Sequence, residues 1–277
     1  MFPVIAAVCL YFAASWLIWL HATGGGANAA THTVANKPAT PAASRLLVAA
    51  VIVLHALQLY EQLYRSGGHG VTNLALGHVV SLVAWTSVTL FLVASLVRRV
   101  LNLGVVVMPS GLLGLLIGAA LPGEAFLLES LPRGAGWHIA IAVPAYGVLS
   151  IAFAQALLLW MHEKQLRQIN RRRLFPALPA LETMESNLLH LIVLGFALLT
   201  VNLLTGMIST HRSHGVLLLF NHHILLSLLA WAGFGALLAG RALFGWRGQM
   251  AAQWTIAAFA VLALAYFGTR FVQDVIL

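Results

Sequence analysis

Long runs of apolar residues without a charged side chain constrain this chain more than any other feature. Residues 191–208, for example, read LIVLGFALLTVNLLTGMI, and about 20 residues of this kind cross the hydrocarbon of a bilayer as a helix. Of the 277 residues, 61% are hydrophobic and only 8% are charged, whereas roughly a quarter of a soluble globular chain is charged. The sequence therefore predicts an all-α polytopic membrane protein and excludes a soluble fold with one apolar core.

Eight such runs follow one another along the chain, mostly with short connections. Their summed length fits one bundle, so we treat residues 1–277 as a single transmembrane domain. The fourth run is the shortest, and its sequence is compatible with a kinked or partly re-entrant segment. The predicted spans are Pro3–Leu20, Ser44–Gln62, Val71–Val97, Val105–Leu121, Trp137–His162, Glu185–Ser209, Val216–Arg241 and Gln249–Val272.

Lys and Arg are concentrated in alternate loops, and this pattern predicts an orientation. If the segment HEKQLRQINRRR, residues 162–173, is cytoplasmic, then 11 of the 15 Lys and Arg lie on the cytoplasmic side. This arrangement satisfies the positive-inside rule at every cytoplasmic connection. It places both termini on the outer face, which is the periplasmic face if the protein lies in the inner (plasma) membrane of a bacterium.

Most of the histidines fall on the predicted outer side. An imidazole inside a membrane span is costly without a partner, so a functional role is the default expectation. Eight of the 12 histidines lie in the outer half or the outer loops: His55, His69, His78, His138, His211, His214, His222 and His223. His138 and His222 stand near helix starts, where the positive end of the helix dipole favours the neutral imidazole that ligates a metal.

A haem iron takes two axial ligands from opposite sides, and two helices facing each other across a bundle can supply them. From the residues alone, His138, His222, His223 and His55 all stay open as such ligands. The plainer interpretation is that histidines and tryptophans are common at the ends of spans. His55 lies deeper, roughly 10 Å below the outer end of its helix.

The neighbours of His138 and His222 also fit a flat anionic ligand. Arg133 and Arg212 lie close to them in sequence and could pair with propionate carboxylates. The span that follows His138 contains Tyr146 and is rich in Ala and Gly. These small side chains leave room for a bulky planar group. Alternatively, these small residues only allow helices to approach closely. Trp137 is expected in the interfacial belt.

Motifs of independent catalysis are missing from the sequence. It contains no Ser-His-Asp set, no paired carboxylates, no phosphate loop and no CxxC, and its one cysteine, Cys9, excludes an intrachain disulfide. The seven acidic residues lie mostly in loops or at span ends, which weighs against an ion-translocating pump. The net charge of +8 is explained by the loops and does not indicate nucleic-acid binding.

Three stretches resemble the cytochrome c assembly protein family, the CcsA-like membrane proteins that handle haem for c-type cytochrome maturation. They are LPALETMESNLLHLIVLGFALLTVNLLTGMI (178–208), GWRGQMAAQWTIAAFAVLALAYFGTRFV (245–272) and WHIAIAVPAYGVLSIAFAQALLL (137–159). In the third stretch, His138 and Tyr146 match a helix that opens with a haem-ligand histidine. The stretches HALQLYEQL and SLVAWTSVTLFLVASL resemble the shorter, eight-span YpjD-like branch of the family. The likeness is strongest over residues 137–272.

The resemblance implies a haem b cofactor with His138 as one axial ligand. For the second ligand, His222 is the preferred replacement by position, with His55 as its rival and with His223 also open. The haem-handling members of the family carry a tryptophan-rich external loop with acidic residues, whereas residues 206–230 of this chain contain no Trp, Asp or Glu. The resemblance therefore implies haem handling or an accessory role in cytochrome c maturation rather than a complete synthetase. The implied partners are the lipid bilayer, haem and other membrane proteins of that process.

Two other functions remain open from the sequence. The histidine-rich outer face is compatible with an accessory subunit of divalent-metal transport, although hard cations prefer oxygen ligands. A b-type electron carrier that oxidises a quinol usually needs a second haem, and the inner half offers only His190 within a span.

Overall fold

The computed structural model of the chain describes residues 2–22, 41–65, 73–97, 100–121, 135–166, 180–214 and 222–268. These residues form helices and no strand, which confirms the predicted all-α fold class. Seven of the helices are long and apolar enough to cross a membrane, and the first contributes a further apolar segment, Val4–Leu20. The helices are α1 (Phe2–Ala22), α2 (Pro41–Tyr60), α3 (Leu76–Val97), α4 (Gly104–Ala120), α5 (Ala135–Leu166), α6 (Leu181–His214), α7 (His222–Phe244) and α8 (Gly248–Ala263).

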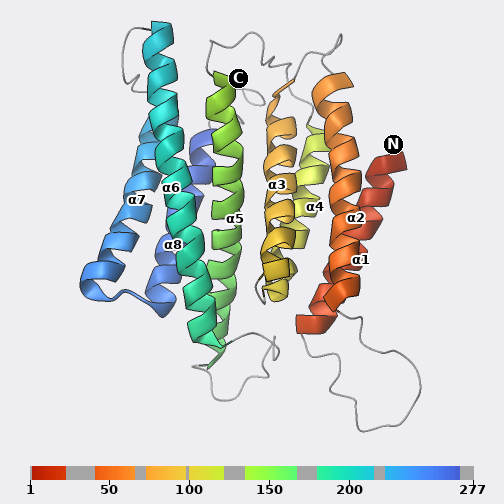
Figure 1. The fold of residues 1–277 in the computed structure, drawn as a ribbon, viewed down its shortest axis with the longest axis horizontal. Helices are drawn as coiled ribbons and strands as arrows, with labels where there is room; N and C mark the ends of the chain where they lie inside the picture. The colour runs from red at the N-terminus through yellow and green to blue at the C-terminus, as the bar shows by residue number, and fades with distance from the viewer. Residues whose placement is uncertain are drawn as a thin grey trace.

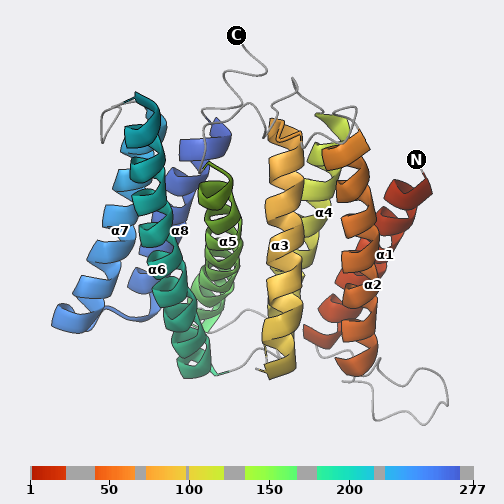
Figure 2. The same cartoon turned by 45° about the horizontal axis from the view of Figure 1, so that its top comes forward.

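The eight helices form two groups of four that stand side by side (Figures 1 and 2). In the first group, α1 packs against α2 and α4, and α3 packs against the same two helices. In the second group, α5 packs against α6 and α8, and α7 packs chiefly against α8. The contact between α3 and α5 is the main junction of the two groups.

Glycines let α4 lie directly against α3. A Cβ atom at Gly114 would overlap Ala84, and one at Gly118 would come within 2.6 Å of the Ser81 Cβ. Such small residues permit close backbone approach where lipid provides no hydrophobic drive between helices. The segment is a continuous helix with Pro109 inside it and is preceded by a 3₁₀ turn, Leu101–Leu103.

Several helix boundaries differ from the predicted spans. The third span was expected from Val71, but α3 begins at Leu76 after a non-helical stretch in which Asn73 N–H donates to Leu63 O and Ala75 N–H donates to Asn73 Oδ1. Helices α5 and α6 have 32 and 34 residues, more than the hydrocarbon requires. Their additional turns are polar, and apolar patterning alone does not reveal them.

A Gly-Trp-Arg-Gly turn joins α7 to α8. Gly245 and Gly248 both have positive φ, 68° and 56°, a conformation that glycine adopts without a Cβ clash. The Gly245 and Trp246 amides donate to the carbonyls of Arg241 and Gly240, which satisfies orphan carbonyls at the end of α7. This motif, one of those that carry the family resemblance, thus has a clear structural role.

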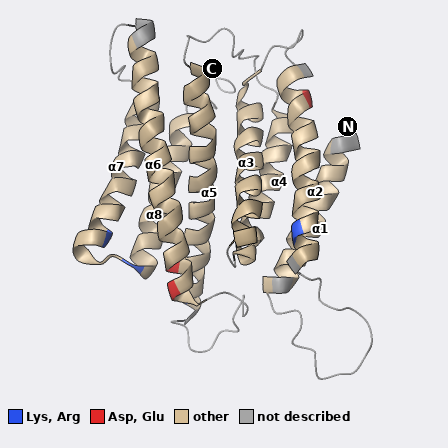
Figure 3. Cartoon of the chain, in the orientation of Figure 1, with Lys and Arg blue, Asp and Glu red and all other residues tan. Residues whose placement is uncertain are grey.

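Described basic side chains gather at one end of the bundle. Arg45 lies in the second turn of α2, Lys164 lies near the end of α5, and Arg241 and Arg247 flank the α7–α8 turn. Among the described side chains, Figure 3 shows Lys and Arg toward the lower end of the helices. This distribution follows the loop pattern seen in the sequence, and the assignment of the lower end to the cytoplasm stays a prediction.

Candidate functional site

A cavity of about 240 Å³ lies near the upper end of the bundle, in the view of Figure 1, where the two groups of helices meet. Residues of α3, α5, α6, α7 and the end of α8 line it. Most are apolar, among them Val79, Val83, Leu199 and Leu262. The polar lining includes His138, Asn202, His223 and Ser227. An apolar cavity with a few polar groups is the usual form of a small-molecule or cofactor site.

His138, in the first turns of α5, is held by a hydrogen bond that fixes its tautomer. Its Nδ1 lies 3.1 Å from the backbone oxygen of Asn202 and 3.4 Å from Thr205 Oγ1. Because a carbonyl oxygen only accepts, Nδ1 carries the proton in this bond and Nε2 keeps its lone pair. Metal-ligating histidines show the same arrangement, with the distal N–H given to a carbonyl. Within the described residues, no hydrogen-bond partner is found for Nε2.

Gly206 on α6 makes room for the His138 ring. A Cβ at this position would lie 3.1 Å from Cε1 and 3.3 Å from Nδ1 of His138. These distances are closer than ordinary van der Waals contact, so a side chain here would move the imidazole. The Asn202–Gly206 turn of α6 therefore positions His138 through both a hydrogen bond and close packing.

His223 reaches the same cavity from α7. Its ring meets Tyr266 in a T-shaped contact, with centroids 6.0 Å apart, and its backbone oxygen accepts a hydrogen bond from Ser227 Oγ at 2.8 Å. A second cavity, of about 270 Å³, lies between α6 and α7 and is also lined by His138, Asn202, His223 and Ser227. The two histidines thus stand where two cavities adjoin.

Asn202 is a polar residue of this junction that sequence reasoning missed. Its side chain is only 7% exposed, and its Oδ1 has no hydrogen-bond partner among the described residues. A buried polar atom without a partner is uncommon and calls for a ligand or a water. The sequence does carry one signal for this residue. Asn202 lies inside an apolar span, where a polar side chain is costly and therefore needs a reason.

Tyr146 forms part of the cavity wall and joins α5 to α8. Its hydroxyl donates to Leu262 O at 3.1 Å, and its ring makes T-shaped contacts with Tyr266 and Phe267. These two aromatics lie in a π-helical turn, Leu264–Gly268, that continues α8. Such turns often occur beside functional sites. Tyr146 is therefore a wall residue with its hydroxyl already engaged.

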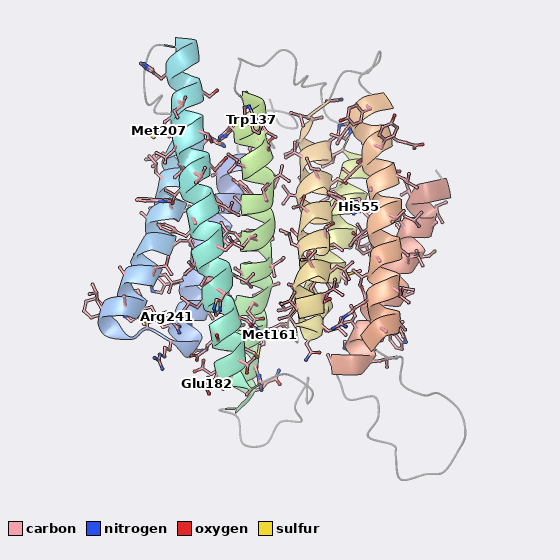
Figure 4. All side chains as sticks on the ribbon, in the orientation of Figure 1. His55, Trp137, Met161, Glu182, Met207 and Arg241 are labelled. Atoms are coloured by element: carbon pink, nitrogen blue, oxygen red, sulfur yellow. The ribbon has the colours of Figure 1, made fainter. Side chains whose placement is uncertain are left out.

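The other predicted site residues lie apart from the two cavities or cannot be placed. His222 is exposed and lines neither cavity, and Trp137, labelled at the upper end of α5 in Figure 4, is 77% exposed. Arg133 lies outside the described residues. Arg212 belongs to the last turn of α6, but its side chain lies outside the described part. The roles predicted for these four residues stay predictions.

His55, the rival ligand, lies in the first group of helices (Figure 4). It is fully buried, with Nδ1 2.8 Å from the Tyr11 hydroxyl and Nε2 2.9 Å from Ser81 Oγ. Both ring nitrogens are therefore engaged, in a network that joins α1, α2 and α3. The structure does not bring His55 together with His138 on either cavity wall.

The fold and the site define a helical, multi-pass membrane protein with two histidines on the walls of adjoining cavities near one end. The family described as cytochrome c assembly protein matches residues 43–277. The chain is 32% identical over 238 residues to the inner membrane protein YpjD of Escherichia coli K12, covering 83% of this chain and 87% of the relative. It is also 36% identical over 140 residues, half of its length, to a 28.8 kDa protein of Azospirillum brasilense, of which 52% is covered. The chain belongs to the cytochrome c assembly protein family.

Proposed function

We propose that this protein binds b-type haem between His138 and His223 and handles haem for cytochrome c maturation in a bacterial inner membrane. The observation that carries the proposal is the orientation of His138, whose Nδ1 is bonded to Asn202 O while Nε2 remains available beside a cavity. His223, on the wall of the same cavity, would be the second histidine to hold the haem in this proposal, and it replaces His222 as the preferred choice.

The two adjoining cavities support a planar ligand. They have His138 and His223 in common, and each extends away from the pair, one toward α3 and α8 and the other between α6 and α7. At about 240 and 270 Å³, either alone is slightly below the usual range of about 300–1,000 Å³ for ligand pockets. The first cavity, together with the space beside the histidine pair that both cavities share, gives a macrocycle adequate room, and the largely apolar walls suit its ring. Bound haem would supply a redox-active iron at this position.

Family membership and the named relative support the cellular role. The family is that of cytochrome c assembly proteins, and the relative from Escherichia coli is described as an inner membrane protein. The segment between Gly206 and Trp231 has no tryptophan or carboxylate of its own. We therefore propose an accessory role in haem handling, without independent catalysis.

The histidine assignment is tested by purifying His138→Ala and His223→Ala variants and measuring haem per chain. Each substitution removes an axial ligand, so we expect haem content or affinity to fall by more than about tenfold. His222→Ala is the matched control, because it changes the adjacent, exposed histidine on the same helix. Full occupancy and an unchanged reduced spectrum in both His138→Ala and His223→Ala would show that the assignment is wrong.

No specific observation favours the divalent-metal alternative or the quinol-oxidising carrier. Among the described residues there is no group of three or more His, Cys, Asp or Glu side chains arranged to hold a metal ion. In the lower half, His190 is exposed and its Nδ1 bonds to Ser186 O of its own helix.

A further inference from the structure

The cavity between α6 and α7 reaches from the half-buried His138 and His223 toward the surface of the bundle. At its inner side it is lined by the buried residues Asn202 and Ser227. Leu203, Met207 and Leu228, which are half-buried, line it farther out. Figure 4 labels Met207 on the upper part of α6. The cavity therefore connects the interior with the side wall of the protein.

Specific contacts close the same helix pair immediately below the cavity. Trp231 of α7 donates its Nε1–H to Thr200 Oγ1 of α6 at 2.9 Å, and its ring stacks on Phe196 with centroids 5.6 Å apart. Above this level, from Asn202 upward, α6 and α7 enclose the cavity instead of packing tightly.

The surface around this opening is apolar. Leu204 and Ile208 of α6 and Leu225 and Leu229 of α7 are exposed large hydrophobic side chains. In a membrane-spanning bundle, such side chains face lipid tails. The opening accordingly faces the hydrocarbon of the bilayer, with Ser209 and Thr210 as polar groups farther up α6.

From this arrangement we infer that the α6–α7 opening is a lateral port through which a porphyrin passes between the bilayer and the histidine pair. The inference rests on the proposed haem site and adds the route to it. An apolar macrocycle partitions into lipid, so a port in the side wall lets it reach the site without crossing water. The carboxylate edge of the ring can follow Ser209 and Thr210, while the ring passes Met207 and Leu228.

The inference is tested with bulky substitutions that plug the port from either side, Met207→Trp on α6 and Leu228→Trp on α7. Val193→Trp and Leu243→Trp are matched controls, because both residues are exposed on the same helices but lie away from the opening. Haem-depleted protein is placed in liposomes loaded with haemin, and the growth of the bound spectrum is followed to completion. We expect both plugs to slow uptake by about tenfold or more, with the same final spectrum and occupancy as the wild type.

The controls are expected to load at the wild-type rate. Trp231→Phe provides a test in the opposite direction, because it removes the hydrogen bond to Thr200 below the port. We expect it to load roughly three- to tenfold faster. Haemin supplied on a soluble carrier protein, in the absence of loaded liposomes, should load the wild type more slowly than the membrane pool.

Failure of this inference can be distinguished from failure of the haem proposal. If the wild type takes up no haemin from either source, the proposed function fails and the port fails with it. If the wild type binds haemin and the plugs load at the wild-type rate, only the port is wrong. Plugs that lower the final occupancy would place the outer part of the α6–α7 cavity, at Met207 and Leu228, in the binding site rather than on a route to it, and would also overturn the inference.

Discussion

At the scale of single residues, the site depends on groups that orient His138 rather than on the histidine alone. Asn202 O accepts its Nδ1–H, and Gly206 leaves space for its ring. Outer groups of this kind commonly change metal affinity by 10–100-fold when they are altered, because they set ligand tautomer and direction. Gly206 is the simplest of them to test.

We expect Gly206→Ala to weaken haem binding by about tenfold while the protein stays folded. The added methyl group would meet His138 Cε1 at 3.1 Å and displace the ring from its bond to Asn202 O. Haem titration of the depleted protein measures the change. Gly235→Ala is the matched control, since it adds a methyl group to a helix interior where the nearest atoms lie at 3.6 Å. Equal affinities for the two variants would contradict the positioning role of Gly206.

At the scale of helices, the sequence predicted where the spans lie but not which faces meet. A helix that is apolar all round shows no inward stripe, so the choice between His222 and His223 could not be made from hydrophobicity. The inward positions of α7 are Ser227, Ala230, Phe234 and Leu237. His223, four residues before Ser227, shares their face, whereas His222 is turned by about 100°. The polar Ser227 was the one signal that favoured His223.

Elements of the first group are joined by the buried network of Tyr11, His55 and Ser81. We expect Tyr11→Phe to lower the free energy of unfolding by about 1–2 kcal/mol, because His55 Nδ1 loses its partner in an apolar interior. Thermal or denaturant unfolding in detergent measures this loss, and Tyr60→Phe, at an exposed tyrosine of α2, is the control.

The haem content of Tyr11→Phe should equal that of the wild type, since the network lies outside both cavities. If Tyr11→Phe lost haem while its stability stayed unchanged, His55 would again be a candidate haem ligand.

At the scale of the whole molecule, the proposed haem site belongs mainly to one of the two groups of four helices. Helices α5 to α8 carry the two histidines, and α3 closes the first cavity with Val79 and Val83. The length of a bilayer-crossing helix is set by physics, which is why eight spans could be predicted from apolar runs. The grouping of helices could not be predicted, because it depends on local fits such as Gly114 against Ala84. The contact of Asn202 with His138 depends on the same kind of local fit, here between α6 and α5.

The most direct test of haem binding is the absorption spectrum of the purified wild-type protein, oxidised and then reduced with dithionite. Haem is quantified in a pyridine extract of the same sample. We expect close to one haem b per chain and a sharp reduced α-band, which is typical of an iron with two histidine ligands. A colourless protein that also fails to take up added haemin would contradict the proposal that this protein binds haem.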